Sequence, residues 1–156
     1  MIHGWRIASP EYSTTLARML NGEGAFMHGG RWNSKGVRMV YLGTSLAQAA
    51  LELLVHLGRA DILNQYSVTR VSFDEELMEH IDVEDLPKDW QALTMASSVQ
   101  SVGDEWIEQA SSLILQVPSA AINGEYNFLL NPTHPDLNKL LLSSITPFKF
   151  DSRFIK

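Results

Sequence analysis

Apolar residues recur at helical spacing in the segment from Leu46 to Leu57. Leu46, Ala49, Ala50, Leu53, Leu54 and Leu57 fall on one face of a helix with 3.6 residues per turn. Ser45 and Gln48 form a capping-box pattern at its start. Gly58 stands at the position where a helix commonly ends. The pattern predicts a helix over residues 45–57.

Several shorter segments are rich in β-branched, aromatic and other apolar residues and are typical of strands. We expect strands over residues 5–8, 37–42, 66–73, 113–117, 125–130 and 144–150. Pro147 places the last of these at a sheet edge, because proline cannot donate a ladder hydrogen bond. Residues 29–33 are expected to form a loop or the edge of a strand.

Cap and breaker residues predict further helices between the strands. We expect helices over residues 10–20 and 135–142, a short helical stretch from Leu86, and a helix over 105–111 capped by Asp104. The segment 75–89 is acidic and is expected to be an irregular part of the surface. The order of elements predicts an α+β fold with strands dominant in the second half.

Length and composition are those of one globular domain. The chain has 156 residues, of which 45% are hydrophobic and 19% charged, and we expect residues 1–156 to form a single domain. The net charge of −6 argues against direct binding of nucleic acid or an anionic membrane, which requires clustered Lys and Arg. The N-terminal residues lack the apolar core of a signal peptide, so we expect a cytoplasmic protein.

Common cofactor and metal motifs are absent from the sequence. The chain has no cysteine, which excludes disulfides, a thiolate nucleophile and Cys-ligated zinc. Gly22-Glu23-Gly24 begins like a dinucleotide fingerprint, but Met27 occupies the position of the third glycine and no strand precedes it. The five histidines are scattered, and Glu52 with His56 is in the wrong order for a zinc protease. We expect no metal.

Glu52 is the first candidate for chemistry. It shares one side of the predicted helix with Gln48 and His56, because the three are spaced by four residues. Its immediate neighbours, Leu51 and Leu53, are apolar. A carboxylate in so hydrophobic a helix should face a partner or a cavity. The alternative is an ordinary exposed helix residue.

Arg31 is the second candidate. Gly29 and Gly30 precede it, and two glycines allow the backbone to approach a ligand or adopt unusual dihedral angles. A planar guanidinium there offers two parallel donors to phosphate oxygens. The alternative is a surface arginine paired with a carboxylate.

Other polar and aromatic residues have ordinary structural readings. Tyr41 in a strand is more often a core residue, and Ser119 at a strand end is more often a turn residue. His56 is more often a rim or core histidine than a base. Asn127, Asn131 and His134 surround Asn131-Pro132, where they can serve as turn and cap residues.

Taken together, these segments resemble the RES domain, a family named for its Arg, Glu and Ser. The resemblance runs from Trp5-Arg6 to about Phe150 and rests on Gly30-Arg31-Trp32-Asn33, Tyr41-Leu42, Ala50-Leu51-Glu52-Leu53-Leu54-Val55-His56, Val117-Pro118-Ser119-Ala120, Glu125-Tyr126-Asn127-Phe128-Leu129-Leu130-Asn131-Pro132 and His134-Pro135. The family's Arg, Glu and Ser fall on Arg31, Glu52 and Ser119, and its tyrosine falls on Tyr41.

The resemblance implies a fold similar to ADP-ribosyltransferases and diphtheria-type toxins, with a mostly antiparallel, split sheet flanked by short helices. It implies the toxin of a bacterial type II toxin–antitoxin pair that consumes NAD as a substrate. The implied partner is an Xre-type antitoxin with a helix-turn-helix DNA-binding domain.

Cleavage of the nicotinamide–ribose bond passes through an oxocarbenium-like transition state, as glycoside cleavage does. In this hypothesis Arg31 binds a phosphate, Tyr41 walls in the nicotinamide, Glu52 stabilises the positive ribose and Ser119 positions the ribose or the carboxylate. Asn33 and Asn131 are expected to join Arg31 and Tyr41 in binding NAD.

Two alternatives remain open at the level of sequence. The enzyme could transfer ADP-ribose to a protein rather than to water, since both reactions share the first step. A non-catalytic interaction domain would instead pair Arg31 with Glu52 as a structural ion pair. Trp90 and Trp106 could form an interface, for example in a homodimer. They could equally close the core.

Overall fold

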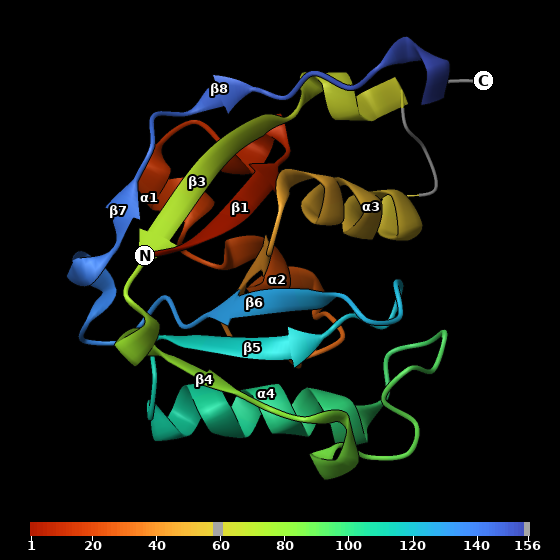
Figure 1. Cartoon of the computed structure of the whole chain (residues 1–156), viewed down its shortest axis with the longest axis vertical. Coiled ribbons are helices and arrows are strands. Elements are labelled where there is room, and N and C mark those ends of the chain that lie inside the picture. Colours follow the sequence, from red (N-terminus) through yellow and green to blue (C-terminus); the bar gives the residue numbers. More distant parts are fainter. Residues whose placement is uncertain (58–60, 155–156) are drawn as a thin grey trace.

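The computed structural model describes residues 1–57 and 61–154. In this part of the chain an eight-stranded sheet has the order β4-β5-β6-β2-β1-β3-β7, with β8 also paired to β3 (Figure 1). The strands are β1 (Ile2–Ala8), β2 (Val40–Gly43), β3 (Ser67–Phe73), β4 (Met78–His80), β5 (Ile114–Pro118), β6 (Tyr126–Leu130), β7 (Leu141–Leu142) and β8 (Thr146–Pro147).

The sheet is narrowest between β1 and β2. These strands share one registered pair, Trp5 with Gly43, whereas β1 and β3 pair over seven residues, from Ile2–Phe73 to Ala8–Ser67. Figure 1 shows β1 and β3 above this junction and β6, β5 and β4 below it. The pairing of β4 with β5 is parallel, and the other pairings are antiparallel. Beyond this pair, β1 and β2 are not joined by a continuous ladder of backbone hydrogen bonds.

Four α-helices accompany the sheet: α1 (Leu16–Met19), α2 (Glu23–His28), α3 (Leu46–Leu57) and α4 (Ser97–Gln109). Helix α3 contacts β1 and β2, and Figure 1 shows it at the side of the molecule where the two parts of the sheet meet. Helix α4 lies below β4 and β5 in the same view. None of the helices in the described ranges is long and apolar enough to cross a membrane.

Burial explains how the helices attach to the sheet. The apolar face of α3 packs with Ile7, Val68 and Phe148, so the helical spacing of the sequence is matched by a core contact. Trp90 and Trp106 are 8% and 5% exposed and belong to the core cluster that includes Val99 of α4. Of the two interpretations of these tryptophans, the structure supports the one in which they close the core.

Several expected elements are confirmed. The predicted helix over 45–57 is α3, and the strands expected over 66–73, 113–117 and 125–130 are β3, β5 and β6 within a residue or two. The α+β class is therefore confirmed. The backbone amide of Gln48 donates to Ser45 Oγ at 3.0 Å, which is the expected N-cap. Gly58 lies outside the described residues.

Other expected elements are wrong in extent or type. The helix expected over 10–20 is a 3-10 turn, Pro10–Tyr12, followed by the single turn of α1, and the strand expected from Val37 begins at Val40. Asp104 lies inside α4 rather than at its start, because Ala96 occupies the N-cap. The helix expected over 135–142 is a 3-10 turn, Leu137–Lys139, followed by β7, because Leu141 and Leu142 pair with β3.

Candidate active site

Glu52 lies on α3, and the start of that helix is fixed against β2. A Cβ on Gly43 would come within 2.5 Å of the Ala49 backbone nitrogen, so the strand and helix can approach this closely only because residue 43 is glycine. The Ser45 cap then fixes where the helix begins. These two local features set the position of Glu52 beside the junction of β1 and β2.

One carboxylate oxygen of Glu52 accepts three side-chain hydrogen bonds. Its Oε1 accepts from Ser119 Oγ at 2.6 Å, from Asn127 Nδ2 at 2.8 Å and from Gln48 Nε2 at 3.1 Å. Hydrogen bonds to a charged acceptor are stronger than neutral ones, so these donors fix the carboxylate firmly. Among the described residues Oε2 has no such partner. The arrangement leaves one oriented oxygen for a ligand.

Ser119 follows β5 and is 1% exposed. Its hydroxyl donates to Glu52 and also accepts from the backbone amide of Ile122 at 3.0 Å, while its own amide donates to Glu125 O at 2.8 Å. Ser119 is therefore both a turn residue, as its ordinary reading held, and a direct partner of Glu52. The structure brings these two candidates together.

Asn127 and Gln48 complete the Glu52 cluster, and the sequence analysis gave them only cap and turn roles outside the site. Asn127 is paired in register with Gly43 of β2 and with Val117 of β5. This register aims its amide at Glu52, and its Oδ1 accepts from Gln48 Nε2 at 3.1 Å. The spacing of Gln48 four residues before Glu52 was the one available signal for the helix partner.

Tyr41 is anchored by its hydroxyl. The hydroxyl accepts from the Trp32 amide at 3.1 Å and donates to Asn33 Oδ1 at 2.5 Å. A Cβ on Gly30 would collide with this hydroxyl, so the glycine before Arg31 makes room for Tyr41. Burial raises the pKa of Tyr41 above its ordinary value, although the Trp32 hydrogen bond and the charge of Arg31 act in the opposite direction. Tyr41 is therefore a neutral group.

Asn33 is fully buried and organises the same turn. Its Nδ2 donates to the carbonyl oxygens of Ala25, Ser34 and Val37 at 2.9, 3.1 and 3.0 Å. All polar atoms of this side chain are engaged with protein, and its exposed fraction is 0%. In this structure Asn33 holds the turn that carries Arg31, and a direct contact between Asn33 and NAD stays a prediction.

Arg31 reaches across to a loop before α4. Its Nη1 donates to Trp90 O at 2.9 Å and to Ala92 O at 2.8 Å. Its Nε and Nη2 have no hydrogen-bond partner among the residues described. Arg31 and Glu52 do not form an ion pair in that part of the chain, and the structural pair required by the non-catalytic interpretation is not observed.

Arg6 of β1 is a site residue that the sequence analysis missed. Its Nε donates to Met19 O at 3.1 Å and its Nη1 to Ile7 O at 3.4 Å. Burial lowers the pKa of Arg6 to about 10, and no carboxylate in the described ranges offsets the desolvation. It remains cationic at neutral pH and lacks an anion. In the sequence, the one signal for a place of Arg6 in the site was its position in the predicted strand that begins with Trp5-Arg6.

A small hollow of about 80 Å³ lies at the junction of β1 and β2. It is lined by Trp5, Arg6, Ile7, Tyr41, Leu42, Gly43, Ala49, Glu52, Leu53 and Asn127. The hollow thus combines an aromatic wall, an oriented carboxylate and a cation. Such a combination can hold an anionic ligand while stabilising positive charge that develops beside the carboxylate.

The remaining candidates lie elsewhere or serve the fold. Asn131 is fully buried just beyond the opposite end of β6 from Asn127, where its Oδ1 accepts from the amide and hydroxyl of Thr133. Its proposed contact with NAD stays a prediction without geometric support. His134 Nε2 contacts Ala110 O at 3.0 Å, and His56 is exposed on α3. Within the described ranges no group of acidic, His or Cys residues is arranged to hold a metal.

The fold and site define an α+β protein with a carboxylate-centred hollow at a sheet junction. Residues 3–151 match the model of the RES domain. The chain therefore belongs to the RES domain family.

Curated relatives are similar over nearly the whole chain, and a solved structure has a similar fold. A protein named Toxin Res from Yersinia enterocolitica is 36% identical over 96% of this chain and 97% of its own. A protein named Prs ADP-ribosylating toxin from a Sphingobium strain is 35% identical over 97% of this chain and 96% of its own. A chain of the MbcT–MbcA toxin–antitoxin complex of M. tuberculosis has a TM-score of 0.74, with 17% identity, over 94% of this chain and 84% of its own.

Proposed function

We propose that this protein is the toxin of a bacterial type II toxin–antitoxin pair, and that it depletes NAD by cleaving the nicotinamide–ribose bond. The observation that carries the proposal is the Glu52 carboxylate, held by Ser119, Asn127 and Gln48 with one oxygen left for a ligand. Relatives named as toxins, one of them ADP-ribosylating, support the same chemistry.

In the proposed reaction the bond between C1′ of the ribose and the nicotinamide nitrogen breaks. The bonding electron pair leaves with nicotinamide, which becomes neutral, and the ribose takes on oxocarbenium character. Glu52 stabilises this positive charge through its unpartnered oxygen. Water then adds at C1′ and loses a proton, giving ADP-ribose. No step requires a metal.

The two arginines suit the phosphates of the substrate. Arg6 is a half-buried cation with no carboxylate partner among the described residues, and Arg31 retains Nε and Nη2 for a ligand after its Nη1 is engaged. A phosphate at Arg6 would offset the desolvation that the guanidinium suffers in the free protein. Tyr41 would wall in the nicotinamide with its ring, since its hydroxyl is already engaged.

We also propose, from the family resemblance, that the fold is related to that of ADP-ribosyltransferases. Transfer of ADP-ribose to a protein is the second candidate reaction. The observation that favours it is the name of the Sphingobium relative, an ADP-ribosylating toxin. Both reactions use the same first step, so the Glu52 cluster serves either one. Intact-mass measurement of candidate targets incubated with NAD would distinguish transfer from hydrolysis.

The proposed partner is an antitoxin, and the toxin–antitoxin complex that contains the similar MbcT fold supports this. We further propose that the antitoxin is of the Xre type, with a helix-turn-helix domain, and that the toxin acts on NAD in the cytoplasm. A homodimer of the toxin within the complex stays a prediction.

The decisive experiment is nicotinamide release from NAD by purified, partner-free protein. Glu52→Gln keeps the shape and removes the charge, and we expect it to lower turnover by about a hundredfold or more. The matched control is Glu108→Gln on the exposed side of α4, which should behave as wild type. Wild-type turnover in folded Glu52→Gln would refute the role given to Glu52.

A further inference from the structure

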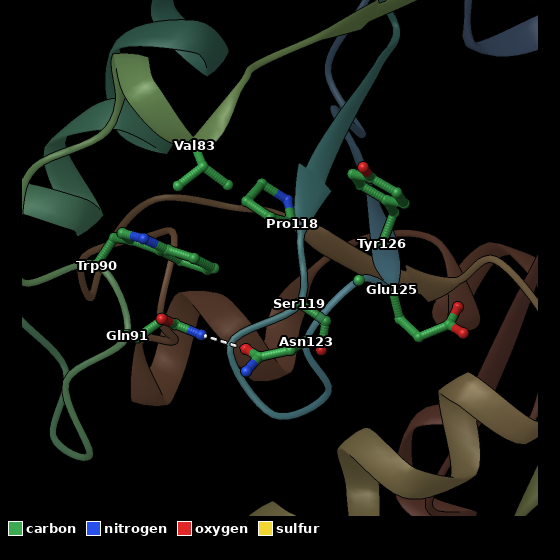
Figure 2. Close-up of a pocket in the computed structure, with 9 residues that line it drawn as sticks. Val83, Trp90, Gln91, Pro118, Ser119, Asn123, Glu125 and Tyr126 are labelled. Atoms are coloured by element: carbon green, nitrogen blue, oxygen red, sulfur yellow. Dashed lines mark hydrogen bonds between the residues drawn. The ribbon is translucent and has the colours of Figure 1, made fainter.

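A second, larger hollow is lined by Ser119, the residue that donates to Glu52 (Figure 2). Its volume is about 240 Å³, against about 80 Å³ for the Glu52 hollow. Residues from three loops and the ends of β5 and β6 line it: Val83, Trp90, Gln91, Pro118, Ser119, Asn123, Gly124, Glu125 and Tyr126. Cleavage at the Glu52 hollow, as proposed, assigns no part of the substrate to this larger hollow.

The lining is aromatic and neutral where it faces inward. Tyr126 is 45% exposed, whereas Trp90, a core residue, contributes only the 8% of its surface that is exposed. Figure 2 shows the Trp90 indole directed toward Pro118. The Glu125 carboxylate points away from Trp90 and Gln91 in the same view. No lysine, arginine or histidine is among the lining residues. The hollow therefore suits a neutral flat ring better than a phosphate.

Two side-chain amides provide a polar edge for such a ring. Gln91 Nε2 donates to Asn123 Oδ1 at 2.9 Å, and the pair is drawn in Figure 2. Among the described residues, Gln91 Oε1 and Asn123 Nδ2 have no other partner, so one acceptor and one donor are left at the two outer ends of the pair. Adenine offers a donor in its amino group and an acceptor in each ring nitrogen, and these are the kinds of group that Gln and Asn amides recognise.

The two hollows are linked by Ser119 and Arg31. Ser119 lines the larger hollow and donates to Glu52, which lines the smaller one. Arg31 donates to the carbonyl oxygens of Trp90 and Ala92, in the segment that walls the larger hollow, and its charge acts on Tyr41 in the smaller one. A cation that contacts the wall of one hollow and acts on a residue of the other suits the diphosphate that joins the two bases of a dinucleotide.

We propose that the hollow lined by Trp90, Gln91, Asn123 and Tyr126 binds the adenine ring of the substrate. The identity of the ligand rests on the proposed function. Adenine stacks on the aromatic surface and is read at its amino edge by the Gln91–Asn123 pair. Nicotinamide is assigned to the Glu52 hollow, because the bond that breaks must lie beside the Glu52 carboxylate.

The experiment is calorimetric titration with AMP, which carries the adenine but no cleavable nicotinamide bond. IMP is the matched ligand, because an oxo group replaces the amino group of the base. We expect AMP to bind wild type more tightly than IMP, and Asn123→Ala to weaken AMP binding by about tenfold and remove the preference. Gln109→Ala, an exposed amide at the end of α4, is the control variant and should bind AMP as wild type does.

NAD turnover measured on the same proteins separates this inference from the proposed function. We expect Asn123→Ala to raise KM for NAD about tenfold and leave kcat unchanged, since the amide does not touch the reacting bond. Equal AMP affinities in wild type and Asn123→Ala, or no AMP binding, would overturn the inference even if wild type cleaves NAD. AMP binding that depends on Asn123 without NAD cleavage would uphold the adenine site and refute the proposed function.

Discussion

The Tyr41 hydroxyl is a structural group, although the residue lines the Glu52 hollow. It satisfies both the Trp32 amide and Asn33 Oδ1, and these partners are buried. We expect Tyr41→Phe to lower the free energy of unfolding by about 1–3 kcal/mol, because two buried polar groups lose their partner. Urea denaturation measures this effect, and Tyr126→Phe, at an exposed position, should stay within about 0.5 kcal/mol of wild type.

The same hydroxyl gives this prediction a pH dependence. Burial raises the pKa of Tyr41 in the fold above its unfolded value of 10.0, so the fold favours the neutral form. The stabilisation is fully present below about pH 10 and is lost at higher pH, by about 1.4 kcal/mol per pH unit, as the unfolded tyrosine ionises first. The stability gap between wild type and Tyr41→Phe should therefore narrow above pH 10. A gap that stays constant between pH 9 and pH 11 would contradict this account.

The candidate residues on single elements could be predicted, and those that depend on pairing between elements could not. Glu52 was indicated by its apolar neighbours on one helix, and Ser119 by a family motif. Asn127 reaches Glu52 because of its register with Gly43, and Arg6 reaches the hollow because β1 meets β2 at one residue pair. No local pattern encodes these long-range pairings.

At the scale of elements, α4 holds the turn that carries Arg31. Asp104 of α4 accepts from the Ser34 amide at 2.9 Å and from Ser34 Oγ at 2.6 Å. Gln100, one turn earlier, donates to the carbonyl oxygens of Gly30 and Asn33 at 3.0 and 3.1 Å. The helix thus ties down both ends of the Gly30–Ser34 segment.

We expect Asp104→Ala to lower the free energy of unfolding by about 1.5–3 kcal/mol, since both bonds involve a charged acceptor. It should also raise KM for NAD, because the Arg31 turn loses an anchor. Ser34→Ala removes only the hydroxyl bond and should cost less. The double variant should show a coupling energy of at least about 0.5 kcal/mol in a denaturation cycle. Strictly additive effects would mean that the two side chains do not act together.

The errors in the predicted elements also have physical causes. Asp104 was expected to cap a helix, yet Gly103 before it already lies inside α4, where a Cβ would collide with the Trp32 carbonyl. The helix expected to end at Leu142 is replaced by a strand, because Leu141 and Leu142 find partners on β3. In both cases a contact far away in sequence overrides the local preference.

At the scale of the whole molecule, the split in the sheet creates the site. The single residue pair between β1 and β2 leaves room for Arg6, Tyr41 and Glu52 to converge, and α3 closes one side. The Glu52 carboxylate, to which we assign the proposed catalytic role, is oriented by three donors of its own chain. Control by an antitoxin must then act on access rather than on assembly of the site.

We therefore predict that the antitoxin suppresses NAD turnover by covering the hollows. Nicotinamide release should fall by at least about tenfold when purified toxin is saturated with its partner, and AMP binding should be lost in the same complex, because both hollows flank Ser119. The test is release and AMP titration with toxin alone and with the reconstituted complex. Full NAD turnover in a stable complex would refute control by access. Loss of turnover with AMP binding intact would show that the partner acts on the Glu52 hollow alone.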